Sequence, residues 1–145
     1  MLGAASLSLP GSIRRSGAAG EVDTFELGIA GYSFVHFGLD TSLAMMQRMN
    51  VRNLCIKDFH LSLNSTDADI AAFHRQLAAA GVTGYAVGPI YMTKSRNEID
   101  QAFDYAKRVG VTLIVGIPNK EDLPYIAEKA KAYDIRYAIH NHGPE

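Results

Sequence analysis

Four junctions with the same pattern recur along the sequence, and they constrain the fold more than any other feature. At each junction an amphipathic stretch ends at Asn, Gly or Asp, and a β-branched residue then opens an apolar run. The junctions are Asn50-Val51, Gly81-Val82, Gly110-Val111 and Asp134-Ile135. Asn and Gly accept the left-handed backbone conformation that ends many helices, whereas Val and Ile favour strands. The pattern therefore predicts four successive helix-to-strand connections.

Apolar residues at helical spacing predict a helix before each junction. The second helix is expected to follow Thr66 or Asp67 as its N-cap. For the third helix, Ser95 and Glu98 predict a capping box, in which the serine side chain accepts from the Glu98 backbone N–H and the glutamate reaches back. The fourth helix contains Pro124, which a helix tolerates only in its first turn. Each helix presents one apolar face, so each can cover a sheet.

Five short runs are expected to form strands, and they are too apolar for a sheet with one solvated face. They are residues 26–34, 52–57, 83–90, 112–117 and 136–142. Such strands alternating with helices indicate a parallel sheet, either closed into a barrel or open and doubly wound. No glycine-rich phosphate loop follows the first strand, which weakens the dinucleotide-binding version of the open sheet. We therefore predict an α/β fold, a partial (β/α)₈ TIM barrel with about four βα units, a fifth strand and a parallel sheet.

The length of the chain limits how much of a barrel it can form. A complete barrel needs about 200 residues or more, whereas this chain has 145. We expect residues 24–145 to form the N-terminal half of a TIM barrel, with the first and fifth strands left as edges that invite association. The alternative is a non-catalytic half-barrel module that pairs these edges with a second copy, as a homo-oligomer.

Residues 1–23 differ in composition from the rest of the chain. A small, apolar segment ends at Pro10, and a Gly/Ser/Ala-rich segment with Arg14 and Arg15 follows. This resembles the end of an export signal, but the basic region that should come first is missing. We expect a flexible tail. If residues 1–10 are a signal remnant the protein is periplasmic or exported, and otherwise it is cytoplasmic.

Charge and composition exclude several classes of partner. The formal net charge is −1, from 14 basic and 15 acidic residues without long runs, so the chain lacks the basic stripe that a nucleic-acid backbone demands. No stretch approaches the roughly 20 apolar residues that a membrane span needs. Cys55 is the single cysteine. It cannot form an intrachain disulfide, and we expect it to be buried.

Polar residues stand where strands are predicted to end, which is where (β/α)₈ barrels carry their catalytic groups. The first strand leads to Tyr32, the second to Lys57 and His60, the third to Tyr91, and the fourth to Asn119. Each of these alone is a weak signal, because loop residues are commonly polar for reasons of solvation.

The end of the fifth strand is the strongest candidate site. His140 and His142 are two residues apart, so in an extended strand both side chains leave the same face. Neutral imidazole is a common ligand of divalent transition metals, and Glu145 could return a carboxylate to the same space past the Gly143-Pro144 turn. The alternative is a pair of solvent-facing histidines in a loop.

The segments Cys55–Leu61 and Ala138–Glu145, at this separation and in this strand order, resemble the xylose-isomerase-like barrel superfamily of sugar phosphate isomerases and epimerases. The resemblance covers residues 25–145, about the first half of the family's barrel. It implies a divalent-metal site whose first ligand, commonly a glutamate, lies on the fifth strand. Here His140 stands at that position, so either a histidine is the ligand or Glu145 supplies the carboxylate. The superfamily also contains dehydratases, lyases and an endonuclease branch, and the near-neutral charge disfavours the last.

The expected function is therefore a metal-assisted isomerase or epimerase acting on a sugar or keto-sugar, with a lyase or dehydratase as the alternative. Mn²⁺, Mg²⁺ or Zn²⁺ would be held by His140 and Glu145, with the remaining ligands beyond residue 145 and the fragment alone inactive. Lys57 and His142 are the expected catalytic residues. Together with His60 and Tyr32, they are also expected to bind substrate.

Overall fold

The computed structural model describes residues 26–142, which form an α/β fold around one parallel sheet. The five strands lie in chain order, and each pairs with its neighbour in parallel. They are β1 Gly28–Ala30, β2 Asn53–Ile56, β3 Thr83–Met92, β4 Leu113–Pro118 and β5 Arg136–Ile139. This topology confirms the predicted fold class, a partial TIM-barrel-like arrangement.

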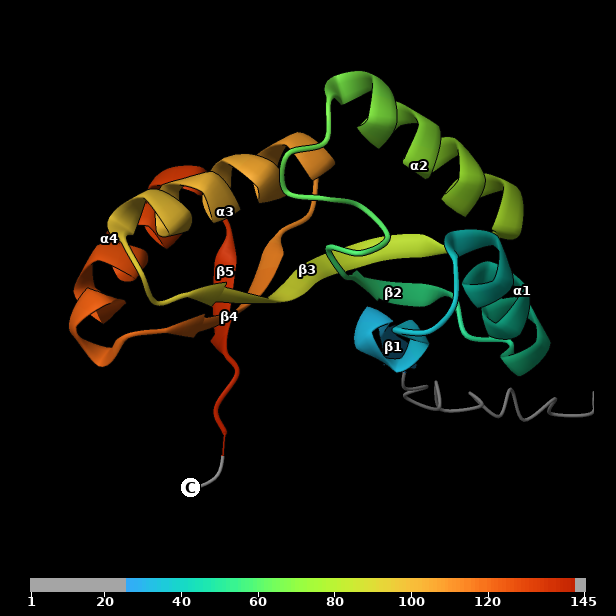
Figure 1. The fold of residues 1–145 in the computed structure, drawn as a ribbon, viewed down its shortest axis with the longest axis horizontal. Coiled ribbons are helices and arrows are strands. Elements are labelled where there is room, and N and C mark those ends of the chain that lie inside the picture. The colour runs from blue at the N-terminus through green and yellow to red at the C-terminus, as the bar shows by residue number, and fades with distance from the viewer. Residues whose placement is uncertain (1–25, 143–145) are drawn as a thin grey trace, which may run out of the picture.

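Four helices connect the strands and form one layer over the sheet (Figure 1). They are α1 Leu39–Met49, α2 Asp67–Ala80, α3 Arg96–Val109 and α4 Leu123–Tyr133. Two short 3₁₀ helices, η1 Gly31–Phe34 and η2 Lys120–Asp122, follow β1 and β4. Helices α1 and α2, α2 and α3, and α3 and α4 are in contact, so the layer is continuous. None of the helices within residues 26–142 is both long and apolar enough to span a membrane.

The four predicted junctions are confirmed. Asn50, Gly81, Gly110 and Asp134 all adopt the left-handed conformation, with φ of 53°, 67°, 79° and 54°. In each case the N–H of the following β-branched residue donates to a carbonyl five residues earlier, at 2.9 to 3.1 Å. This bond is the 6→1 contact of the Schellman motif. It ends the helix and turns the chain into the next strand.

Three strands are shorter than the sequence predicted, and of these β2 loses only one residue at each end. The expectation that residues 26–34 form a strand was wrong beyond Ala30, because η1 folds the chain closely over β2. A Cβ at Gly31 would lie 2.7 Å from the Cys55 carbonyl oxygen. Strand β5 likewise ends at Ile139 instead of residue 142. The last backbone bond between β5 and β4 runs from the His140 N–H to the Gly116 oxygen, at 2.8 Å.

The capping box lies on a different helix from the one predicted. Ser95 is the N-cap of α3, but its side chain makes no capping hydrogen bond. Glu98 instead accepts from the Lys94 backbone N–H at 2.9 Å, so its carboxylate is turned away from Ser95. The capping box is at α2, where Thr66 accepts from the Asp69 N–H and Asp69 accepts from the Thr66 N–H. Pro124 lies in the first turn of α4, as predicted.

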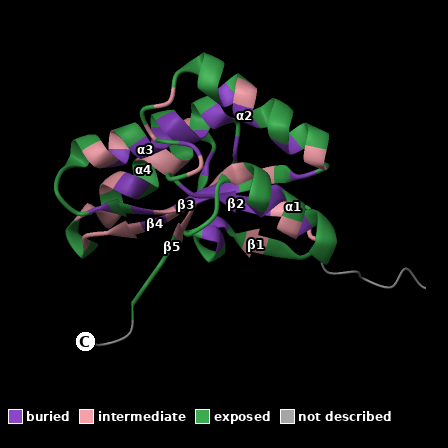
Figure 2. Cartoon of the chain, turned by 45° about the vertical axis from the view of Figure 1, so that its right-hand side comes forward, coloured by how far each residue is buried: buried purple, intermediate pink, exposed green. Residues whose placement is uncertain are grey.

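The core lies between the helix layer and the sheet, where Figure 2 shows the buried residues. Leu54, Ile56, Ile114 and Phe103 are at most 1% exposed. Cys55 is also buried, as expected. The opposite face of the sheet, which we call the inner face, is not covered by any of the four α-helices (Figure 1). On this face Cys55 and Ala86 near the middle of the sheet are buried, whereas Tyr91 near the end of β3 is 62% exposed and available for other contacts.

Candidate functional site

The candidate site lies where the strands end. Because all five strands are parallel, their carboxyl ends meet at one edge of the sheet, which we call the carboxyl edge. Lys57 directly follows β2, Tyr91 is the penultimate residue of β3, and His140 directly follows β5. An amine, a phenol and an imidazole from three separate strands thus lie at the same edge of the sheet.

The strand register places Tyr91 and His140 on the inner face. Tyr91 pairs with Ile117, and Gly116 pairs with Ile139, so His140 follows in line with Ile117. Gly116 faces the helix layer, because a Cβ there would lie 2.2 Å from the hydroxyl of the core residue Tyr137. Successive residues of a strand alternate between faces. Ile117, and with it Tyr91 and His140, therefore points to the inner face.

Three rings gather at this end of the inner face, and we call Tyr91, His140 and His142 the His–Tyr cluster. The centroids of the two imidazoles are 5.1 Å apart with an interplanar angle of 80°. The centroids of Tyr91 and His142 are 6.4 Å apart with an angle of 32°. Residues from β3 and from the chain after β5 therefore form a single group of rings.

The imidazole spacing is compatible with a shared metal ion. Two imidazoles bound to one Zn²⁺ through bonds of about 2.0–2.1 Å have centroids roughly 5 Å apart. A catalytic site normally takes about three protein ligands, and residues 26–142 contain no cluster of three or more His, Cys, Asp or Glu placed to hold a metal. Glu145, the predicted carboxylate ligand, lies outside the described residues. The described residues thus contain one of the two predicted ligands, His140, with the imidazole of His142 beside it, and the metal site stays a prediction.

Lys57 brings a buried positive charge to the same edge. The residue is 9% exposed. Its Nζ lies 2.5 Å from Asp58 Oδ1 and 5.9 Å from the centroid of the Phe59 ring. Ile56, the residue before Lys57, lies in the core under the helices, so alternation directs Lys57, like Cys55, toward the inner face. An ammonium has three donors, and Asp58 is half exposed, so the charge can also meet an anionic oxygen.

Tyr32 and His60 lie in the loops beside this edge. Tyr32 is 58% exposed in η1. His60 Nε2 lies 3.0 Å from the Phe37 carbonyl oxygen and 3.3 Å from Ser42 Oγ. Because a carbonyl only accepts, Nε2 carries the proton and donates, which ties the loop after β2 to the loop after β1. The binding of substrate by His60 and Tyr32 stays a prediction.

Cys55 is not a nucleophile in this arrangement. Burial raises the pKa of its thiol to about 11, and the nearby positive charge of Lys57 only partly opposes this shift. The thiol is therefore neutral at pH 7, whereas the thiolate is the reactive form. Its sulfur lies 3.6 Å from the Gly88 carbonyl oxygen, which it contacts as a weak donor.

Tyr91 is indicated only weakly by the sequence, as one polar residue at a strand end among several. Its orientation depends on an irregularity in the pairing of β3 with β4. The local signal was the Gly88-Pro89 pair inside an apolar run, since glycine and proline inside a strand mark a bulge.

No family model and no curated protein matches this chain. Two solved structures have a similar fold. An uncharacterized protein from Parabacteroides distasonis is 24% identical, with a TM-score of 0.75, over 81% of this chain and 53% of that one. A xylose isomerase domain protein from Alicyclobacillus acidocaldarius is 14% identical, with a TM-score of 0.61, over 83% of this chain and 51% of that one. The chain thus spans about half the length of each neighbour and shares the coarse xylose-isomerase-like fold, and at these identities the likeness shows the fold alone.

Proposed function

We propose that this chain supplies the first half of the active site of a sugar isomerase- or epimerase-like enzyme that uses a divalent metal. The observation that carries the proposal is the location of the His–Tyr cluster on the inner face at the carboxyl edge, with the buried ammonium of Lys57 at the same edge of the sheet. This is where barrels of this architecture perform their chemistry. The fold shared with a xylose isomerase domain protein supports the same class of reaction.

In this proposal His140 and Glu145 hold Mn²⁺, Mg²⁺ or Zn²⁺, with the remaining ligands beyond residue 145. When bound, the metal polarises a carbonyl and the adjacent hydroxyl of the sugar. His142 moves a proton at the neighbouring carbon. Lys57 faces the oxygen on which negative charge develops and stabilises it, because its ammonium is buried and positioned before the reaction. Tyr32 and His60 line the substrate pocket.

A second candidate is the half-barrel module that pairs with another copy of itself. It is favoured by apolar side chains exposed at both ends of the sheet, Leu27 just before β1 at 68% and Ile139 on β5 at 55%. Edge strands with such residues invite pairing. A sedimentation experiment distinguishes the candidates, since the module requires a defined dimer without bound metal.

The test of the enzyme is proton exchange at the carbon beside the carbonyl. The full-length protein is incubated with Mn²⁺ and either D-fructose or D-xylose in D₂O, and deuterium incorporation is followed by NMR. We expect incorporation in the wild type and a loss of at least about 100-fold in His140→Ala and Lys57→Met.

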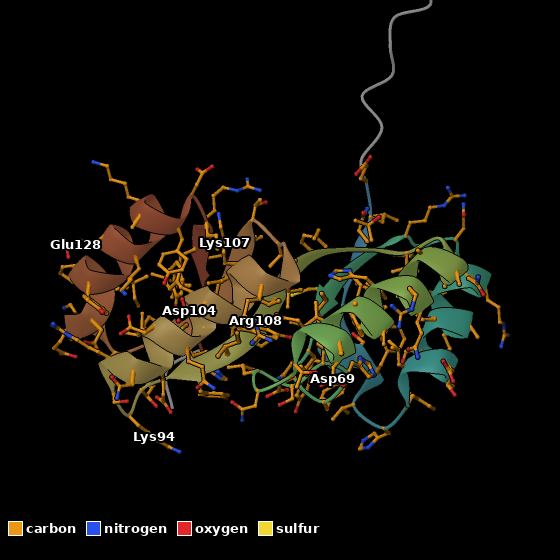
Figure 3. The ribbon with its side chains drawn as sticks, turned by 90° about the horizontal axis from the view of Figure 1, so that it is seen from above. Asp69, Lys94, Asp104, Lys107, Arg108 and Glu128 are labelled. Carbon is orange, nitrogen blue, oxygen red and sulfur yellow. The ribbon has the colours of Figure 1, made fainter. Side chains whose placement is uncertain are left out.

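The matched control is Lys107→Met. Lys107 is exposed on α3 in the helix layer, as Figure 3 shows, so this variant should exchange at the wild-type rate. Equal exchange in His140→Ala and the wild type would contradict the proposal.

A further inference from the structure

Strand β3 contains an extra residue just before the candidate site. Val87 pairs with Ile114 and Ile90 pairs with Gly116, so three steps along β3 match two steps along β4. Such a two-against-one mismatch is a β-bulge, and bulges beside active sites re-aim side chains. The bulge therefore determines which way the end of β3 presents its side chains.

The bulge turns Tyr91 away from the core. Val87 is 1% exposed, and its partner Ile114 lies in the core under the helices. Plain alternation from Val87 would direct Tyr91 toward the helices as well. The extra residue reverses this pattern, so that Ile90 and Met92 are buried at 8% and 0% exposure while Tyr91 is 62% exposed.

The structure around Gly88 maintains this arrangement. Gly88 has a φ of 132°, and a Cβ there would lie 2.1 Å from the Val115 carbonyl oxygen. Only glycine tolerates both the conformation and the close approach of the backbone of β4. The bulge is therefore a built feature of the sheet, and Tyr91 is held on the inner face by the backbone instead of by its own packing.

Tyr91 presents a flat ring beside polar groups that can bind a hydroxylated ligand. His142 lies 6.4 Å from it, centroid to centroid, and His140 lies beyond His142. Small-molecule sites combine aromatic walls with a few placed polar groups. A sugar has this mixed character, because one face of its carbon chain carries C–H bonds and its edges carry hydroxyls.

We propose that Tyr91 is a substrate-binding residue whose ring packs against the C–H face of a sugar and directs the sugar's hydroxyls toward His140 and His142. The choice of a sugar as ligand rests on the proposed function, whereas the orientation of Tyr91 rests on the bulge alone. Tyr91 forms the apolar wall of the site, and its hydroxyl is not needed for this role.

The experiment is saturation-transfer NMR on the full-length protein with D-xylose and D-fructose as probes. Saturation of the aromatic protons should reach the sugar C–H protons in the wild type and in Tyr91→Phe. In Tyr91→Leu we expect the sugar affinity to fall roughly 2- to 10-fold, the range of an aromatic contact. Tyr85→Leu is the control, because Tyr85 is a 41% exposed tyrosine near the other end of the same strand.

The outcomes separate this inference from the proposed function. Sugar binding that depends on Tyr91 without any deuterium exchange would contradict the proposed reaction and support the binding role. Exchange with an unchanged KM in Tyr91→Leu would support the reaction and overturn the binding role. An absence of transfer to both sugars would also overturn it. So would a lower melting temperature of Tyr91→Leu with unaltered binding, because Tyr91 would then pack inside the full-length protein.

Discussion

The two faces of the sheet have opposite compositions although the same strands build both. The face under the helices holds Leu54, Ile56 and Ile114, all at most 1% exposed. The inner face holds Tyr91 at 62% exposure, the exposed His140 and the charged Lys57. Successive side chains along each strand point to opposite faces of the sheet, so each strand contributes to both faces. One set buries apolar surface and stabilises the fold, and the other set leaves Tyr91 and His140 exposed at the carboxyl edge, where they can bind a ligand.

The largest expected contrast compares one aromatic residue from each side of the sheet. Phe103 is fully buried and lies 5.6 Å from Tyr133 and 6.4 Å from Tyr137, centroid to centroid. Phe103→Ala should lower the free energy of unfolding by about 3–5 kcal/mol. Tyr91→Ala should change it by no more than about 0.5 kcal/mol, as for a surface position. Urea unfolding measures both, and similar losses would contradict the division between the faces.

The second contrast tests the β-bulge in β3, which determines that Tyr91 points to the inner face. Gly88→Ala places a methyl group against the backbone of β4 in a conformation that costs about 1–3 kcal/mol by itself. The control is Gly110→Ala, since Gly110 also has a positive φ but has open space where the methyl group would stand. We expect Gly88→Ala to be the more destabilising variant and to shift the NMR signals of Tyr91. Equal losses of stability in the two variants would mean that the bulge does not depend on the close approach of Gly88 to the backbone of β4.

The sequence predicted the parallel α/β fold because its signals are local. Each left-handed residue, such as Gly81 or Asp134, stands directly beside the β-branched residue that opens the next strand. The orientation of Tyr91 could not be predicted in this way, because the pairing of β3 with β4 decides where an extra residue is accommodated. The early end of β1 could not be predicted for the same reason, because the contact of Gly31 with β2 is not local in sequence. Which residues meet at the site thus depended on strand register.

The third prediction concerns the start of the helices beside the carboxyl edge. Thr66→Ala should lower the free energy of unfolding by about 1 kcal/mol, because the threonine side chain caps α2. Ser95→Ala should have almost no effect, because the Ser95 side chain makes no capping bond at α3. Thermal unfolding of the two variants measures the difference. A larger loss of stability for Ser95→Ala would mean that Ser95 does cap α3, as the sequence predicted.

The smallest expected effect lies under the helices, where the hydroxyl of Tyr137 is buried without a hydrogen-bond partner among residues 26–142. At pH 7, Tyr137→Phe should leave stability unchanged or raise it by up to about 1 kcal/mol. Tyr105→Phe is the control and should lower it by about 1 kcal/mol, because the Tyr105 hydroxyl donates to the Leu61 carbonyl at 2.7 Å. A clear loss in Tyr137→Phe would mean that this hydroxyl has a partner.

The same pair predicts the response to alkaline pH. Burial raises the pKa of both Tyr137 and Tyr105, so above the usual tyrosine pKa of about 10 the unfolded chain releases protons that the folded chain keeps. The folded state then binds more protons, and stability falls as pH rises. Each substitution to Phe should make this decline shallower. A stability that is flat between pH 9 and about pH 11 in the wild type would contradict the shifts.

The central claim is that the inner face at the carboxyl edge carries the chemistry, and a metal titration followed at each histidine ring tests it most directly. Residues 1–145 contain five histidines, and NMR of ¹⁵N-labelled imidazoles can follow Zn²⁺ binding at each of them. We predict that the His140 signal changes most, because its ring binds the metal, and that the His142 signal changes with it, because its ring centroid lies 5.1 Å from that of His140. The signals of His36, His60 and His74 should stay in place. Changes confined to the other three rings, or no change at substoichiometric metal, would contradict the account.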